Sequence, residues 1–291
     1  VNFCWHLVNR NKRSVVLDLK HPDGRAAFDR LLATADIVVV NFPLKVRDRL
    51  RMRYADVKHV NPRLIYASMT GYGESGPDAE QPGFDSTAFF ARSGLLDGLT
   101  YEGGPPAFSL PAQGDQMTGM NLFAAVAMAL LHRERTGEGS EVGTSLHASG
   151  LWSNAILAQG ALLGSFVAPR PPRNKPRSAL ANQYRTSDGR WIQLTIVRED
   201  KLWAPLCRAL GRPELLDDPR FVEIGERRQR TRVGRDRCEV EIGVQQALEP
   251  VVHAVAKARD HHRHAERGGE RHRERGHRRA GAREVPAEVA Y

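Results

Sequence analysis

Three short apolar runs alternate with amphipathic stretches near the start of the chain, and this alternation constrains the fold more than any other feature. The runs are Ser14–Leu19, Ile37–Val40 and Leu64–Met69. Between the first two, apolar residues recur at helical spacing from Ala26 to Leu32. Continuous apolar strands that alternate with helices are typical of parallel βαβ units, whose sheet is covered by helices. We therefore expect an α/β fold with a parallel sheet.

Further elements follow along the chain. Glycine and proline predict a loop over residues 71–83. A stretch rich in Ala, Leu and Met predicts a helix over Thr118–Arg135, which ends at the glycines of Thr136–Gly139. A strand over Glu141–Leu146 and a helix over Trp152–Leu163 complete this part of the pattern.

Two domains and a tail are expected. Residues 1–165 form the predicted large domain, and a proline-rich, basic segment over residues 166–182 links it to a small α+β domain over residues 183–224. The elements predicted for the small domain are a hairpin of the strands Asn182–Thr186 and Trp191–Val197 and a helix over Asp200–Leu210.

Residues 225–291 form a basic tail of different character. Residues 225–284 hold 16 Lys and Arg against 10 Asp and Glu, which is most of the net charge of +9. Such a segment buries too little apolar surface to offset its ordering entropy, so we expect disorder. Salt-sensitive nucleic-acid binding is an alternative role, weakened by the lack of aromatic residues between Val222 and Tyr291. We expect only adventitious metal binding at His261–His264 and no functional metal site.

Cysteine usage and hydropathy indicate a cytoplasmic protein. Cys4, Cys207 and Cys238 are far apart and have no metal-ligand spacing, so neither a disulfide framework nor a metal site is expected. The apolar run Leu122–Leu131 is about half of the roughly 20 residues that a membrane helix needs. The N-terminal residues do not show the pattern of a secretory signal.

The segment Gly71–Gly76 matches the G-x-G-x-x-G fingerprint of dinucleotide-binding proteins. That fingerprint requires a helix to begin at this point. Pro77 and Pro82 disfavour such a helix, so we interpret the segment as a loop.

Asp115 precedes the predicted long helix, and two interpretations of it stay open. An aspartate at this place is most often a helix cap, because its carboxylate accepts hydrogen bonds from free N–H groups. The same position favours an ionised carboxylate that can act as a nucleophile, and nearby N–H groups can stabilise an oxyanion. Gly114 and Gly119 would allow a substrate to approach the backbone closely.

An ordered series of short motifs resembles the class III CoA-transferase family, which includes formyl-CoA transferase, carnitine CoA-transferase relatives and α-methylacyl-CoA racemase. The likeness spans about residues 8–221. The motifs are Asn11–Ser14, Leu17–Leu19, Asn41–Phe42, Asp48–Leu50, Asn61–Ile65, Gly71–Gly73, Gly114–Asp115, His132–Arg133 and Thr136–Gly139.

The resemblance implies a two-domain α/β protein whose two subunits interlock as a homodimer. Coenzyme A and acyl-CoA are then substrates, together with a small carboxylic acid, and no prosthetic group is implied. Asp115 matches the aspartate that attacks acyl-CoA to give an acyl anhydride and then an aspartyl-CoA thioester. The positions expected along bound CoA are Lys12, Arg13, Asn41, Phe42, Arg49, Leu50, Gly71 and Tyr72. Lys12 and Arg13 would contact phosphates, with surface ion pairing as the alternative.

Phe84 bears on which reaction the resemblance implies. Racemases of the family carry an acid–base histidine before an aspartate, and Phe84 holds that position before Asp85 here. A phenyl ring cannot accept a proton, so racemisation is the less favoured alternative. Residues 76–94 are more similar to transferases that act on 2-hydroxy, aryl or branched acids.

Both ends of the chain depart from the family pattern. The resemblance implies a βα unit before the position of Asn11, which we expect to be missing, and a helical return after about Glu223, which is unrecognisable. We interpret the tail as an out-of-frame translation. A non-catalytic remnant is therefore a further alternative to an active transferase.

Overall fold

The computed structural model describes residues 2–165, 168–172, 176–178, 180–185, 189–209, 211–219 and 221. The chain divides after Arg170 into two compact units. The predicted tail and its histidine cluster lie outside the described residues.

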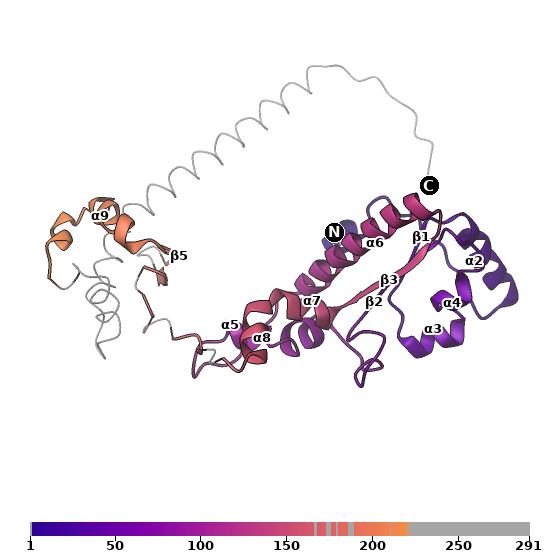
Figure 1. Cartoon of the computed structure of the whole chain (residues 1–291), viewed down its shortest axis with the longest axis horizontal. Coiled ribbons are helices and arrows are strands. Elements are labelled where there is room, and N and C mark those ends of the chain that lie inside the picture. The colour runs from indigo at the N-terminus through magenta and orange to yellow at the C-terminus, as the bar shows by residue number, and fades with distance from the viewer. Residues whose placement is uncertain are drawn as a thin grey trace, which may run out of the picture. The chain divides into compact units, whose positions relative to one another are not determined.

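A parallel sheet of three strands forms the centre of the first unit (Figure 1). Its strands are β1 (Ile37–Val40), β2 (Ile65–Thr70) and β3 (Ser140–Ser145), in the order β1-β2-β3. Ile37 pairs with Ile65, and Ile65 pairs with Ser140 on the other side. The central strand β2 has a neighbour on each side, and its residues are buried from Ile65 to Ser68. The predicted parallel α/β fold is confirmed.

Helices cover both faces of the sheet. The helices α2 (Pro22–Thr34), α3 (Leu44–Leu50) and α4 (Tyr54–Val57) enclose a core that includes Tyr66 of β2. The neighbouring residue Ala67 points to the opposite face, where it packs against α6 (Gln113–Thr136). Alternate side chains of one strand thus join two different cores, as expected for a strand covered on both sides.

The long helix α6 begins at Gln113, before the predicted start at Thr118, and ends as predicted at Gly137, whose φ of 81° only glycine adopts readily. The helix predicted over Trp152–Leu163 is instead two helices, α7 (Leu146–Ser153) and α8 (Ala155–Leu162). A π-helix, η1 (Asp85–Ala91), and α5 (Leu95–Leu99) precede α6 and were not predicted.

The strand predicted over Ser14–Leu19 is wrong. This segment is irregular, and the side chains of Val15 and Val16 are 65% and 93% exposed. A β-branched run forms a strand only when another strand satisfies its backbone, and β1 pairs only with β2 in the described part of the chain. The helix α1 (Phe3–Val8) precedes this segment.

The second unit contains the predicted hairpin and helix. Strands β4 (Gln183–Arg185) and β5 (Trp191–Gln193) pair antiparallel. The helix α9 (Glu199–Ala209) and the 3-10 helix η2 (Pro213–Leu216) follow. Its buried core consists of Leu180, Trp203, Cys207 and Phe221. Among the helices of the described residues, none is long and apolar enough to cross a bilayer.

Candidate active site at the carboxyl ends of the strands

A cavity of about 480 Å³ lies where the three parallel strands end. Asn41 follows β1, Met69 and Thr70 end β2 and are followed by Gly71, and Leu146 follows β3. The carboxyl edge of a parallel sheet is where such folds bind ligands. The complete lining is Asn41, Met69, Thr70, Gly71, Gly83, Phe84, Asp85, Ser86, Ser109, Pro111, Ala112, Asp115 and Leu146.

Asp115 lies in the first turn of α6 and lines this cavity. It is exposed, and its carboxylate makes no hydrogen bond to any described residue. The N-cap of α6 is Ala112, which has a left-handed backbone with φ of 59° and no side-chain capping bond. Asp115 is therefore not the cap of the helix, although it lies in the first turn, where a helix N-terminus carries a partial positive charge.

The capping role belongs to Asp85, from the preceding π-helix. Its Oδ1 accepts a hydrogen bond from the Gly114 N–H at 3.1 Å. Burial raises the pKa of Asp85, and the negative charge of Asp115 raises it further, although hydrogen bonds from the backbone at Gly114 and Ala112 oppose the shift. Two carboxylates therefore lie at the N-terminus of α6. That of Asp85 accepts a hydrogen bond from the backbone, and that of Asp115 lines the cavity.

Glycines set the close approaches around the site. A Cβ on Gly114 would collide with Asp85 Oδ1 and the ring of Phe89, so this glycine serves packing against η1. The expectation that Gly114 lets a substrate reach the backbone is wrong for that reason. A Cβ on Gly71 would lie 2.7 Å from the Gly83 Cα, so this glycine pair lets the end of β2 meet the segment that carries Asp85.

The structure brings only some of the predicted CoA-binding residues to the cavity. Asn41 and Gly71 line it together with Asp115. The other six lie outside the lining, and their role in binding CoA stays a prediction. Among them, Leu50 packs against the core below the sheet, and the ring of Tyr72 lies 5.9 Å from that of His147. The remaining four are exposed: Lys12, Arg13, Phe42 and Arg49.

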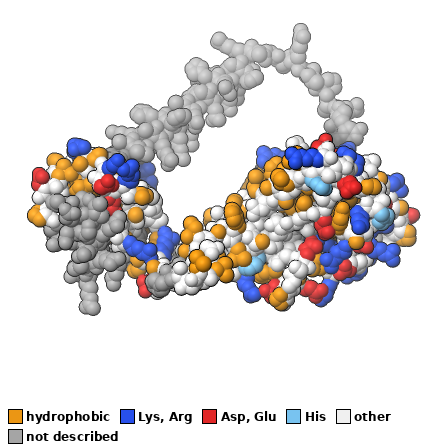
Figure 2. All heavy atoms as spheres, in the orientation of Figure 1, with side chains coloured by type: hydrophobic (Ala, Val, Ile, Leu, Met, Phe, Trp, Pro, Cys, Tyr) orange, Lys and Arg blue, Asp and Glu red, His pale blue; other side chains and the backbone are white. Residues whose placement is uncertain are grey.

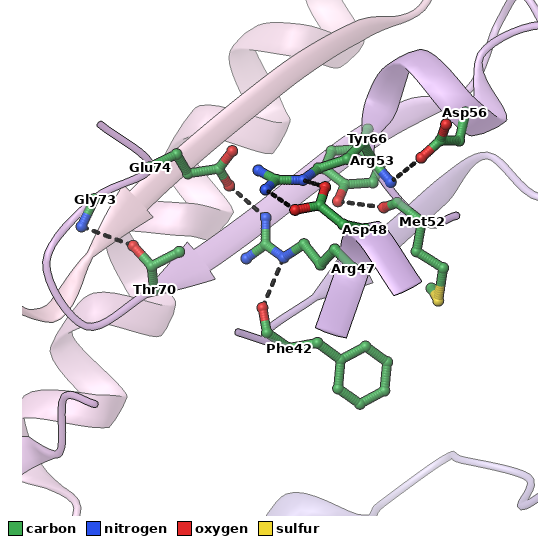
Figure 3. A network of polar contacts seen from close by, with 10 residues as sticks. All are labelled: Phe42, Arg47, Asp48, Met52, Arg53, Asp56, Tyr66, Thr70, Gly73 and Glu74. Atoms are coloured by element: carbon green, nitrogen blue, oxygen red, sulfur yellow. Dashed lines mark hydrogen bonds and ion pairs between the residues drawn. The ribbon is translucent and has the colours of Figure 1, made fainter. Parts of the chain in front are cut away.

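A polar network lies beside the cavity, between α3 and the loop after β2 (Figure 3). Arg47 is completely buried, donates from Nε to the Phe42 carbonyl at 2.7 Å, and forms an ion pair with Glu74. Burial raises the pKa of Glu74, but hydrogen bonds from Ser68 and Arg47 and the nearby positive charges outweigh this effect and leave the pKa below its ordinary value.

Sequence reasoning missed both Asp85 and Arg47. Asp85 contacts a backbone group 29 residues away, and Arg47 pairs with a residue 27 positions away. Arg47 lies in a strongly charged stretch that indicates an exposed helix. The sequence offered one hint of Asp85, because it directly follows Phe84, the position that we compared with the histidine of racemases. In the described part of the chain, no three His, Cys, Asp or Glu side chains gather in a way that could hold a metal ion.

The chain matches the model of CoA-transferase family III over residues 1–267. The chain belongs to CoA-transferase family III. This confirms the resemblance drawn from the ordered motifs.

Two relatives in this family illustrate the similarity. The chain is 35% identical over 224 residues to cinnamoyl-CoA:phenyllactate CoA-transferase of Clostridium sporogenes, covering 77% of this chain and 54% of the relative. It is 33% identical over 223 residues to (R)-2-hydroxy-4-methylpentanoate CoA-transferase of Clostridioides difficile, covering 77% and 55%. The chain thus spans about half the length of these curated relatives.

Solved structures of the family share the fold. A CAIB/BAIF family protein from Brucella suis superposes with a TM-score of 0.70 at 28% identity, covering 85% of this chain and 64% of that one. The protein Rv3272 of Mycobacterium tuberculosis gives a TM-score of 0.67 at 29% identity, covering 86% and 66%. The α/β architecture of this family III chain is therefore that of its relatives.

Proposed function

We propose that this family III chain transfers coenzyme A between carboxylic acids with Asp115 as the nucleophile. The proposal rests on the different roles of two aspartates at the start of α6. Asp85 accepts the hydrogen bond from the helix backbone, while the Asp115 carboxylate faces a cavity large enough for a reacting group. The nucleophile of this reaction is a carboxylate, and the partial positive charge of a helix N-terminus attracts a negatively charged group.

The reaction proceeds through covalent steps on Asp115. A carboxylate oxygen attacks the thioester carbon of acyl-CoA, the carbon–sulfur bond breaks, and CoA leaves as the thiolate. The thiolate then attacks the aspartyl carbon of this anhydride, which forms aspartyl-CoA and releases the donor acid as its carboxylate. The acceptor carboxylate attacks aspartyl-CoA, and the thiolate, released again, attacks the acceptor carbon of the second anhydride. New acyl-CoA leaves, Asp115 is restored, and no proton is gained or lost.

The cavity lining supports acids with an apolar side chain. Met69, Phe84 and Leu146 contribute apolar surface beside Asp115. The two relatives are named for phenyllactate and 2-hydroxy-4-methylpentanoate, an aryl and a branched 2-hydroxy acid. We extend this class to the present chain. Phe84 cannot carry a proton, so the racemase alternative lacks its acid–base partner in this position.

We further propose that CoA lies along the predicted residues near the cavity and that two copies of the chain associate. Hydrophobic side chains are exposed on α6, α7 and α8, and Figure 2 shows such side chains over the region of α7 and α8. Exposed fractions reach 64% for Phe123, 77% for Trp152 and 87% for Ile156. Exposed apolar side chains on three neighbouring helices favour a protein partner, and the family resemblance implies a second copy.

A trapping experiment tests the nucleophile. The full chain is incubated with an aryl or branched acyl-CoA and then with hydroxylamine, which converts an activated aspartyl group into a hydroxamate. Peptide mass spectrometry should place the modification on Asp115, and the Asp115→Asn variant should stay unmodified. Asp97, exposed on α5, provides an internal comparison that should also stay unmodified. An unmodified Asp115 in a folded preparation that binds CoA would argue against the proposal.

A further inference from the structure

Two loops that border the cavity are joined by one buried side chain, that of Arg47. The first loop follows β1 and contains Asn41 and Phe42, and the second follows β2 and runs from Gly71 to Glu74. Arg47 Nε donates to the Phe42 carbonyl at 2.7 Å, and Arg47 Nη1 pairs with the Glu74 carboxylate. Figure 3 shows the guanidinium between these two groups.

Stability alone does not explain why an arginine is buried at position 47. Its side chain is fully buried, and Nη2 has no hydrogen-bond partner among the described residues. Removing a guanidinium from water is unfavourable, and an apolar residue of similar volume often stabilises a core as well or better. A directional role explains the arginine better, because its planar fork fixes the orientation of the groups that it contacts.

The Glu74 loop has little freedom once this pair forms. The Gly73 N–H donates to Thr70 Oγ1 at 2.8 Å, which turns the chain directly after β2. Because the pKa of Glu74 is below its ordinary value, the carboxylate remains charged at neutral pH and the ion pair with Arg47 persists. Gly71, which lines the cavity, lies between the strand and this anchor.

We propose that Arg47 and Glu74 are a positioning pair, which holds the loops after β1 and β2 in the arrangement that binds the CoA portion of the substrate. Neither residue lines the cavity, so the pair acts through Asn41 and Gly71. Asp115 is held separately, through the contact of Gly114 with Asp85. Loss of the pair therefore weakens binding of acyl-CoA and leaves the chemical step on Asp115 intact. This inference rests on the proposed transferase function.

A second buried arginine provides a matched control. Arg133 is 8% exposed and donates from Nη1 to the carbonyls of Asp36 and Arg63, each at 3.3 Å. These residues lie before β1 and β2, so Arg133 joins the same two strands at the opposite edge of the sheet. It also has one buried nitrogen, Nε, without a hydrogen-bond partner in the described part of the chain.

The test compares Arg47→Met, Glu74→Gln and Arg133→Met in the full chain. We expect Arg47→Met and Glu74→Gln to raise KM for acyl-CoA by about tenfold, the size of a lost charged hydrogen bond, with kcat within about twofold. Arg133→Met should leave KM unchanged. Amide hydrogen exchange should accelerate over residues 41–42 and 71–76 in the first two variants only. The Glu74 side chain is 33% exposed, whereas that of Arg47 is fully buried, so Glu74→Gln provides a result even if Arg47→Met folds poorly.

The outcomes separate this inference from the proposed function. Equal KM values and equal loop exchange in Arg47→Met and Arg133→Met would overturn the positioning pair. If the loops loosen only in Arg47→Met and Glu74→Gln while acyl-CoA leaves wild-type Asp115 untrapped, the loop arrangement is supported and the transferase function is contradicted. A fall in kcat without a change in KM would assign the pair to the chemical step and contradict the inference.

Discussion

A buried arginine joins the segments next to β1 and β2 at both the amino and the carboxyl edge of the sheet, that is, at both ends of its strands. The surroundings of the two arginines differ. At the amino edge, Arg133 joins the segments before β1 and β2, and Asn61 adds a hydrogen bond from its amide to the Ala35 carbonyl at 2.9 Å. A Cβ on Gly139 would collide with the Leu64 carbonyl there, so the backbones are in direct contact.

At the carboxyl edge, Arg47 joins the loops after the same strands, but these loops do not close over the strand ends. The first turn of α6, which contains Asp115, lines the cavity between these loops. A buried arginine is thus no sign of function in itself. The difference lies in whether the segments that it holds are packed against each other or line an opening.

The largest expected effect is on Asp115. Asp115→Asn should lower transferase turnover by about a thousandfold or more, because the amide cannot form the anhydride. The exposed side chain contributes little to packing, so the thermal midpoint should change little. At the amino edge, Asp36→Asn removes a carboxylate that pairs with Arg133 at 3.0 Å and should leave turnover unchanged. Steady-state kinetics of both variants checks this contrast.

Glycine substitutions give the next largest effect. Gly114→Ala should destabilise the fold by about 1–3 kcal/mol, because its Cβ collides with Asp85 and Phe89, and should also lower trapping at Asp115. Gly139→Ala, at the amino edge, should destabilise the fold without a specific effect on trapping. Gly119→Ala places its Cβ in open space and should be neutral or stabilising. Denaturant unfolding and trapping yield at a temperature where all variants are folded would measure both effects.

The smallest expected effect is on the acid stability of the fold. The folded-state pKa of Glu74 is lowered, so its stabilising contribution is fully present above the unfolded pKa, about 4.3 for glutamate. That contribution is lost as the pH falls through the lower folded value. Glu74→Gln should therefore lose less stability than the wild type between pH 7 and pH 3. Asp36→Asn should behave as the wild type does, because its Glu74 pair is intact.

Local sequence patterns correctly predicted elements that are determined by nearby residues. They also predicted strands that bury apolar side chains. The apolar runs of β1 and β2 and the glycine end of α6 are of these kinds. The segment Ser14–Leu19 also contains β-branched residues, Val15 and Val16, but a strand needs a neighbour, and Val16 is 93% exposed. Pattern alone cannot supply that neighbour.

The site itself was only half accessible to sequence reasoning. Asp115 was identified by the family motif, while physical reasoning alone left the helix-cap interpretation open. The structure decides against that interpretation because Asp85, far away in sequence, supplies the cap. The burial of Arg47 could not be predicted, because its charged sequence neighbours are equally typical of an exposed arginine.

Transfer of oxygen from the acceptor acid to Asp115 is the most direct measurement of the proposed chemistry. An acceptor acid labelled with oxygen-18 in both carboxylate oxygens is supplied with unlabelled acyl-CoA. If the acceptor passes through an anhydride with Asp115, one labelled oxygen remains on that side chain after acyl-CoA leaves. Mass spectrometry should therefore find oxygen-18 in the peptide that contains Asp115 and not in the same peptide of Asp115→Asn. Unlabelled Asp115 in a preparation that forms the new acyl-CoA would contradict the mechanism.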